Sequence, residues 1–166
     1  MAIIQVPSVQ GGGMALLSTT TLSGASTTIS GIDQTYRNLQ ILIFGMTNAT
    51  TDGIFKVKPN GSATLLYWQS LKIDGTVARG APDDRLQDNN LLRTDTNSHY
   101  VIDVYDYANT TRAKPIYFSG ITVTSSSTRP LFGGGSIYTN SALTSIEFSN
   151  TGGTFSSGTV LIYGVK

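Results

Sequence analysis

The chain has 166 residues, of which 39% are hydrophobic and only 13% are charged, a length that suits one domain with a sizeable core. It contains no cysteine, which excludes disulfides, zinc–thiolate sites, thiol nucleophiles and iron–sulfur clusters. The formal net charge is +1 without a dense lysine or arginine cluster, so the sequence predicts no binding to nucleic acid or to an anionic membrane surface. About a quarter of the residues are Ser or Thr, as in strands whose outward faces carry hydroxyl groups.

Residues 1–13 are predicted to form an extended arm, because Pro7 disfavours regular structure and Gly11-Gly12-Gly13 supplies a flexible joint. The alternative is a frayed terminus. The arm lacks the basic region and long apolar stretch of a secretory signal, and no stretch of the chain approaches the roughly 20 apolar residues of a membrane span. Exposure of its apolar residues to water is unfavourable, so we expect them to contact a neighbouring subunit. They are Ile3, Ile4, Val6 and Val9.

Short runs rich in Thr, Val and Ile, separated by turn residues, predict strands at 15–23, 25–32, 38–47 and 53–58. The run Leu39–Phe44 is apolar on both faces, which predicts a central strand that is covered on each side. Asn60-Gly61 is the pair that a type I′ turn requires, and it predicts a hairpin whose returning strand includes Leu65–Trp68.

Residues 74–97 hold most of the charge density and are predicted to form a long surface loop, with one helical turn starting near Pro82. Two long strands, 100–105 and 116–123, are expected to follow, joined through a turn at 109–112. The run Gly133-Gly134-Gly135 predicts a bulge or a tight connection between strands. Further strands are expected at 136–138, at 143–148 and in the terminal run 158–166.

These elements add up to about eight to ten short strands with no alternation of strands and helices. The sequence therefore predicts an all-β fold: a single antiparallel β-sandwich over residues 14–166, jelly-roll-like, with the extended arm before it. The first and last predicted strands are expected to lie near one another.

Three segments resemble small virion structural proteins of tailed bacteriophages. They are Leu17–Ser26 (LSTTTLSGAS), Gly31–Ile41 (GIDQTYRNLQI) and Tyr163–Lys166 (YGVK). The resemblance covers the first third and the final turn, and the middle of the chain only in general texture. Such proteins occur as capsid decoration (cement) proteins and as head- or tail-fibre modules, commonly as β-sandwich trimers. The resemblance implies a homotrimer, made in the host cytoplasm, on the outer surface of the phage particle, with the major capsid protein or other virion subunits as partners.

The leading functional interpretation is a non-enzymatic decoration protein that binds and stabilises the assembled head shell. One compact domain with a short adhesive arm suits a shell, whereas a fibre usually carries a longer shaft. The alternative is a fibre or receptor-binding module that recognises host surface glycans, and a polysaccharide hydrolase ranks third.

No catalytic residue, cofactor or metal site is predicted. His99 is the only histidine and the chain has no Gly-x-Ser-x-Gly elbow, which disfavours a serine triad. The carboxylate pairs Asp103/Asp106 and Asp83/Asp84 fit a glycosidase by composition alone. Oxygen ligands for Ca²⁺ gather at Asp83, Asp84, Asp88, Asn89 and Asn90, but the arginines between them favour surface ion pairs.

Tyr67 and Trp68 are adjacent on one predicted strand, so they cannot both face inward. One of them is expected to meet a neighbouring subunit, the long loop or a ligand. The candidate interface residues are therefore Ile3, Ile4, Val6, Val9, Tyr67 and Trp68.

Overall fold

The computed structural model describes residues 13–72, 77–86, 91–123 and 128–166. The four apolar arm residues Ile3, Ile4, Val6 and Val9, and the candidate cation ligands Asp88, Asn89 and Asn90, lie outside this described part. Every regular element in it is a strand, and it contains no helix that is long and apolar enough to cross a membrane.

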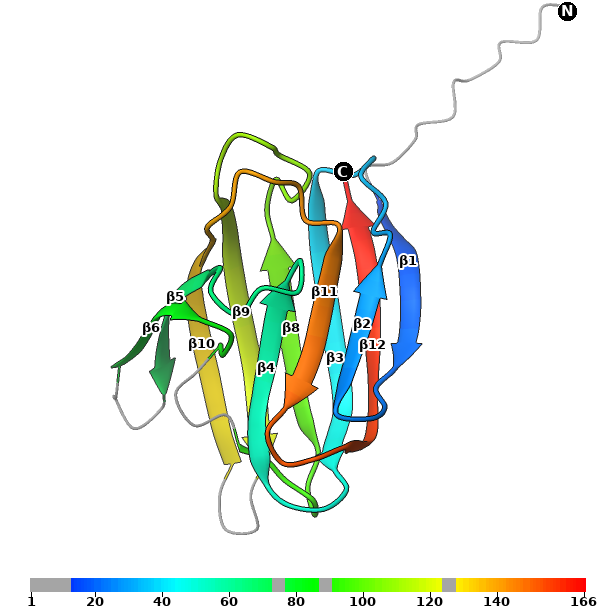
Figure 1. The fold of residues 1–166 in the computed structure, drawn as a ribbon, viewed down its shortest axis with the longest axis vertical. Coiled ribbons are helices and arrows are strands. Elements are labelled where there is room, and N and C mark those ends of the chain that lie inside the picture. Colours follow the sequence, from blue (N-terminus) through cyan, green and yellow to red (C-terminus); the bar gives the residue numbers. More distant parts are fainter. Residues whose placement is uncertain (1–12, 73–76, 87–90, 124–127) are drawn as a thin grey trace, which may run out of the picture.

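Twelve strands are present. They are β1 (Met14–Thr21), β2 (Ser26–Ser30), β3 (Asn38–Asn48), β4 (Gly53–Pro59), β5 (Leu66–Lys72), β6 (Val77–Asp83), β7 (Leu91–Leu92), β8 (Ser98–Val104), β9 (Lys114–Val123), β10 (Thr128–Ile137), β11 (Ser145–Asn150) and β12 (Phe155–Val165). They form an eight-stranded sheet in the order β1-β12-β3-β8-β9-β10-β5-β6 and a four-stranded sheet in the order β2-β11-β4-β7. All strand pairs are antiparallel, and the two sheets pack face to face (Figure 1).

The strand order is that of a jelly roll that carries two insertions. Half of the large sheet, β1-β12-β3-β8, faces the small sheet β2-β11-β4-β7, and the chain crosses between these two layers as a jelly roll requires. The hairpins β5–β6 and β9–β10 are inserted into this path and widen the large sheet beyond β8. The predicted antiparallel, jelly-roll-like β-sandwich is confirmed, and so is the closeness of its ends, because Met14 of β1 pairs with Val165 of β12.

The core lies between the sheets and is filled by alternate residues of each strand. From β3 come Leu39, Ile41 and Ile43, each only 1% exposed. From the small sheet comes Phe55, whose ring stacks on Tyr100 of the large sheet with 5.3 Å between ring centroids.

β3 is a central strand, as predicted, since it pairs with both β12 and β8. The prediction that it is covered on each side is wrong for this chain alone. Its outward residues Leu42 and Phe44 lie on the face turned away from the small sheet, and Phe44 is 42% exposed. An apolar outward face on a central strand is the first sign that this surface has a partner.

The Asn60-Gly61 turn forms, but it does not make a hairpin between β4 and β5. Asn60 and Gly61 have positive φ angles of 49° and 71°, as a type I′ turn needs. However, β4 pairs with β11 and β7, while β5 pairs with β10 and β6. The Asn60 side chain directs this change of sheet, because its Oδ1 accepts hydrogen bonds from the backbone N–H groups of Thr144 (3.0 Å) and Ser145 (3.2 Å) at the start of β11.

The predicted loop over 74–97 contains β6 and β7, and no helical turn occurs at Pro82 or elsewhere among its described residues. Pro82 lies in β6, the edge strand of the large sheet, where a missing N–H donor is tolerated. After β6 the chain crosses to the small sheet, where the Val57 N–H donates to the Asp84 carbonyl oxygen (2.6 Å) and Lys56 Nζ pairs with Asp84 Oδ2 (3.0 Å). The fully buried Leu86 then lines a small cavity together with Leu66, Ile116 and Ile137, which belong to the widened part of the large sheet.

The three glycines 133–135 are neither a bulge nor a connection. They lie inside β10 and pair with β9 and β5 without a shift in register. A Cβ at Gly133 would lie 2.3 Å from Phe118 Cζ, and a Cβ at Gly135 would lie 1.9 Å from the Tyr67 carbonyl oxygen. These glycines therefore make room for a core ring and for the backbone of β5.

We predict that Gly135→Ala destabilises the protein by about 1–3 kcal/mol, because the added methyl group overlaps the β5 backbone. Gly134→Ala is the matched control, since its Cβ would point outward with its nearest neighbour, the Ile116 carbonyl oxygen, 3.3 Å away. Urea unfolding of both variants and the wild type measures the difference. Equal unfolding midpoints for the two variants would show that the backbone approach at Gly135 is not tight.

A second prediction concerns Tyr100, whose phenol is buried and hydrogen-bonded to Thr122 Oγ1 (3.1 Å). Burial raises the pKa of Tyr100 to about 12, whereas a tyrosine in the unfolded chain titrates near 10. Because the folded protein holds this proton more tightly than the unfolded chain, protonated Tyr100 contributes fully to the free energy of unfolding below pH 10. Between pH 10 and pH 12 the unfolded chain releases the proton while the folded protein retains it, so this contribution is lost. Two pKa units correspond to about 3 kcal/mol.

Free energies of unfolding measured between pH 9 and 11.5 should therefore fall more steeply for the wild type than for Tyr100→Phe. The variant is expected to lose about 1 kcal/mol at neutral pH from the missing hydrogen bond. Parallel pH profiles for the two proteins would contradict the burial of this phenol.

Candidate interaction surface

A row of mostly apolar side chains crosses the outer face of the large sheet. Successive strands place residues in register with one another, and alternation along each strand turns these residues away from the small sheet. From β12 to β5 the row runs Leu161, Leu42, Val101, Ser119, Phe132 and Leu71. Phe132 and Leu71 are each 50% exposed, so the row is open to solvent in the single chain.

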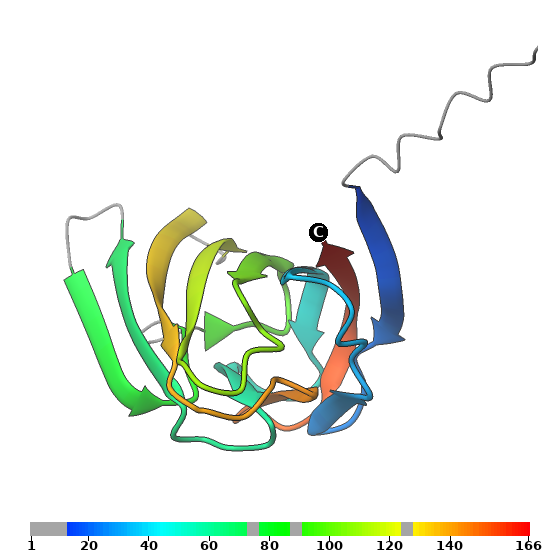
Figure 2. The same cartoon turned by 90° about the horizontal axis from the view of Figure 1, so that it is seen from above.

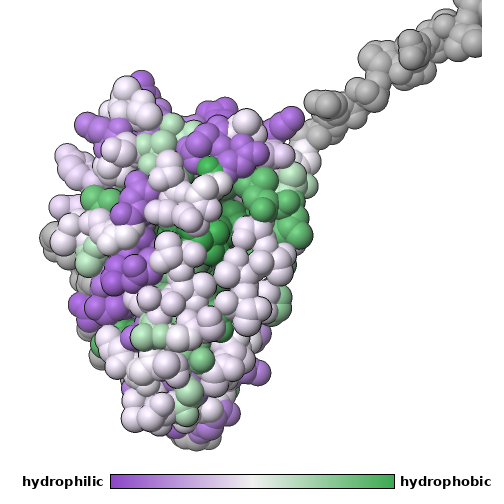
Figure 3. Space-filling view, turned by 45° about the vertical axis from the view of Figure 1, so that its right-hand side comes forward, coloured by the Kyte–Doolittle hydropathy of each residue, from purple (hydrophilic) through white to green (hydrophobic). Residues whose placement is uncertain are grey.

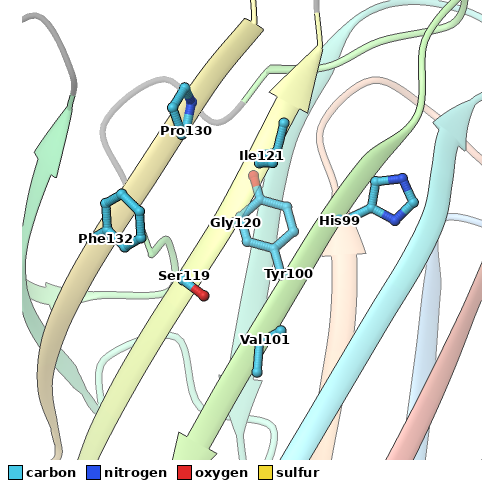
Figure 4. A pocket seen from close by; sticks show the side chains of 8 residues that line it. All are labelled: His99, Tyr100, Val101, Ser119, Gly120, Ile121, Pro130 and Phe132. Atoms are coloured by element: carbon cyan, nitrogen blue, oxygen red, sulfur yellow. The ribbon is translucent and has the colours of Figure 1, made fainter.

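The centre of this row is hollowed because Ser119 is small. Its register neighbours on either side are Val101 and Phe132, and the next row above consists of His99, Ile121 and Pro130. Together with the backbone at Gly120 they line a depression of about 240 Å³ (Figure 4). Its rim residue Ile121 is 43% exposed. The depression is thus shallow and mostly apolar.

A polar row borders the apolar one. Gln40 Nε2 donates to Asp103 Oδ1 (2.9 Å), and Asp103 is in register with Tyr117 on β9. An apolar centre with a polar rim is the usual anatomy of a protein–protein interface. The arrangement therefore favours binding of another protein over catalysis.

Tyr67 and Trp68 point in opposite directions, as their adjacency requires. Tyr67 faces outward on the large sheet and is 38% exposed, whereas Trp68 is 3% exposed and belongs to the core. Its burial removes Trp68 from the residues that can contact a partner, which corrects its place among the candidate interface residues. Tyr67 keeps that role.

A second, polar depression lies where the turn after β8 meets the chain that leaves β10. Tyr138 is 67% exposed, and its ring meets that of Tyr67 edge-on with 5.4 Å between centroids. The depression measures about 360 Å³. Its lining residues are Thr111, Arg112, Ala113, Tyr138, Thr139 and Asn140.

Lys114 is buried beneath this depression and links the two segments that form it. Its Nζ donates to the carbonyl oxygens of Arg112 (2.9 Å) and Thr139 (2.7 Å), and burial lowers the pKa of this ammonium group. Within the described residues neither Lys114 nor Arg112 forms an ion pair with a carboxylate. The depression therefore carries positive charge next to an exposed aromatic ring.

Of the residues considered for catalysis, Asp84, Asp103 and Asp106 each bind a neighbouring side chain. Asp103 binds Gln40, and Asp106 in the turn after β8 pairs with Arg37 Nε (3.2 Å), so the two carboxylates bind different partners. The His99 ring points away from Ser119 (Figure 4), so these two do not form a base–nucleophile pair. Asp84 pairs with Lys56. Where the structure describes the chain, no group of three or more metal-binding side chains gathers.

Comparison of the chain with protein-family models, with curated protein sequences and with solved structures gives no match. The surface residues that sequence reasoning missed are Leu42, Val101, Ile121, Phe132 and Arg112. For the first four a signal existed, because strands of a half-exposed sheet that are apolar at both odd and even positions must have two apolar faces. No short sequence pattern predicts the Tyr138 depression, because it forms where two turns that are distant in sequence meet.

Proposed function

We propose that this protein is a non-enzymatic structural component of a virus particle: a decoration protein that binds the outer surface of an assembled tailed-phage head. In this proposal it acts as a homotrimer, with the major capsid protein or another virion subunit as partner. The supporting observation is the apolar outer face of the large sheet. The resemblance of its N-terminal third to phage structural proteins is the reason for proposing a phage particle as its location.

The size of this face fits an interface. Its eight exposed large hydrophobic residues present on the order of 700 Å², given roughly 200 Å² for a fully exposed side chain of this size. They are Met14, Leu16, Phe44, Tyr67, Leu71, Tyr117, Ile121 and Phe132. Gln40 and Asp103 lie between Leu16 and Tyr117 in one row, so this area is a sum over the whole face, and it approaches the roughly 800 Å² that each partner of a standard interface buries.

Binding through such a face strengthens a shell by mass action. A ligand that binds only the assembled state stabilises that state by an amount set by its concentration relative to its dissociation constant. An apolar face needs no precise hydrogen-bond partners, so one surface can bridge two neighbouring capsomers. The polar rim at Gln40 and Asp103 fixes the orientation.

We predict that Phe132→Asp abolishes loading onto stripped particles and leaves the fold intact, because it places a charge in the apolar row beside the depression at Ser119. Ser26→Asp, an exposed position on the outer face of the small sheet, is the control and should load like the wild type. Co-sedimentation with particles measures loading, and circular dichroism checks folding. Normal loading of a folded Phe132→Asp variant would exclude the outer face as the docking surface.

Particles with and without the protein separate the proposed function from its alternative. A decoration protein should raise the temperature of genome release and leave adsorption to host cells unchanged. If adsorption falls while shell stability is unaffected, the receptor-binding interpretation replaces decoration. The variant Asp106→Asn, whose carboxylate lies outside the apolar row and its polar rim, should match the wild type in both assays.

The second candidate function is recognition of a host glycan, and the Tyr138 depression favours it. The apolar C–H face of a sugar ring packs on an exposed aromatic ring, and hydrogen-bond donors of Arg112 and Asn140 border the same space. Arg112 forms no ion pair within the described part of the chain and lies next to the buried Lys114, and these positive charges favour an acidic sugar.

If this site binds glycans, Tyr138→Ala should lower binding on a glycan array at least tenfold, because it removes the stacking surface. Tyr105→Ala, which removes a 43% exposed tyrosine elsewhere, should have no effect. Arg112→Gln should weaken acidic glycans more than neutral ones. An array without any bound glycan would dismiss this function and leave decoration standing.

A further inference from the structure

The two sides of the sandwich are closed differently. On the β6 side the chain itself bridges the sheets, through the Val57–Asp84 backbone hydrogen bond and the Lys56–Asp84 ion pair. On the other side β1 ends the large sheet and β2 ends the small sheet, and each has a strand partner on one side only, β12 and β11 respectively. Both views of the ribbon place β1 and β2 at this same side (Figures 1 and 2).

Between these two edges lies a groove of about 340 Å³, whose lining contains the polar residues Ser18, Ser30 and Asp33. Its lining includes the core residues Ile29, Ile32 and Ile162, together with the half-buried Leu17 in the bulge of β1. Figure 3 shows hydrophobic residues gathered in a hollow at this side of the molecule, close to the start of β1. An open edge that gives access to core side chains is a site for an added strand.

The arm supplies a segment of matching chemistry. Residues 1–12 precede the described part of the chain, and they are long enough to span about 40 Å when extended. Ile4 and Val6 alternate with the polar Gln5, which is the pattern of a strand with one buried face. Pro7 lacks an N–H donor, which an edge strand tolerates.

We propose that residues 3–9 of one copy insert as an extra strand along β1 in the groove of a neighbouring copy. The apolar side chains of Ile4 and Val6 then cover Leu17, Ile29 and Ile162. This inference shares with the proposed function only the requirement that the protein assembles. The inference concerns contacts between copies of this chain, whereas the proposed function concerns contacts with a shell.

The register argues for a neighbouring copy over the chain's own groove. A turn at Gly11-Gly12-Gly13 that returned the arm along its own β1 would pair Gln10 with Met14, and hence Ser8 with Leu16 and Pro7 with Leu17. That register puts Val6 opposite Ser18, within the β1 lining of the groove at residues 16–18, but leaves Ile4 opposite Thr20 and Ile3 opposite Thr21, beyond that lining. An arm from another copy has no such constraint and can place Ile4 and Val6 at Leu17. Repeated around a three-fold axis, this exchange closes a ring.

The test uses the absence of natural cysteines. One chain carrying Val6→Cys and a second carrying Leu17→Cys are co-expressed and oxidised. A disulfide needs Cα atoms within about 7 Å, so a covalent dimer is expected only if the arm of one copy lies in the groove of another. A Gln5→Cys chain in place of Val6→Cys is the matched control and should give much less dimer, because its side chain points out of the groove.

Light scattering of the full chain provides the second measurement. Ile4→Asp/Val6→Asp should reduce the wild-type oligomer to monomer, a threefold fall in mass for a trimer, whereas Gln5→Asp/Ser8→Asp should keep the oligomer. A monomeric wild type, an oligomer that survives Ile4→Asp/Val6→Asp, or a disulfide formed only within a chain that carries both cysteines would each overturn the proposal. None of these outcomes depends on phage particles, so the decoration function stands or falls separately, on the loading of Phe132→Asp.

Discussion

The contact between the inner faces of the two sheets holds this molecule together, and Phe55 lies at its centre. Its ring stacks on Tyr100 of the large sheet and on Phe148 of its own sheet, at centroid distances of 5.3 and 6.1 Å. Close packing of such rings leaves little freedom in how the sheets align. The alignment of the sheets also determines which residues face outward, because successive side chains of a strand point to opposite faces: when one set packs in the core, the other faces solvent.

The large sheet has twice as many strands as the small one, and this mismatch shapes the rest of the molecule. The small sheet covers β1, β12, β3 and β8, while the inner face of the inserted hairpins is covered by the segment that carries Leu86. Nothing in the described part of the chain covers the outer face, although it is apolar across six strands. The outer face adjoins the other two surfaces, because its Tyr67 contacts Tyr138 and its Leu16 also lines the β1–β2 groove.

Much of the fold could be predicted from sequence, because alternation and turn residues are local signals. The strands around 15–23, 25–32, 38–47 and 53–58 and the pairing of the chain ends were predictable in this way. The sheet that the chain enters after a turn could not be predicted in this way. The Asn60-Gly61 pair determines the backbone angles of the turn, but the hydrogen bonds from Asn60 to Thr144 and Ser145 determine which sheet the next strand joins. The glycines 133–135 were misread because their cause, the approach of Phe118 and of the β5 backbone, comes from residues 15 to 70 positions away.

The pairing of β1 with β12 has a consequence for how the protein folds. Met14 and Val165 meet in the sheet although almost the whole chain separates them, so β1 stays without its partner until the last strand has left the ribosome. Such distant pairings raise the contact order and slow folding to the range of milliseconds to seconds or longer. During synthesis the apolar strand β3 also lacks its neighbour β12, so its unpaired edge can associate with other chains and aggregate. The large sheet can therefore be completed only after β12 has been synthesised, and the yield of folded protein in a cell depends on how long the unfinished sheet can be kept from pairing with another chain.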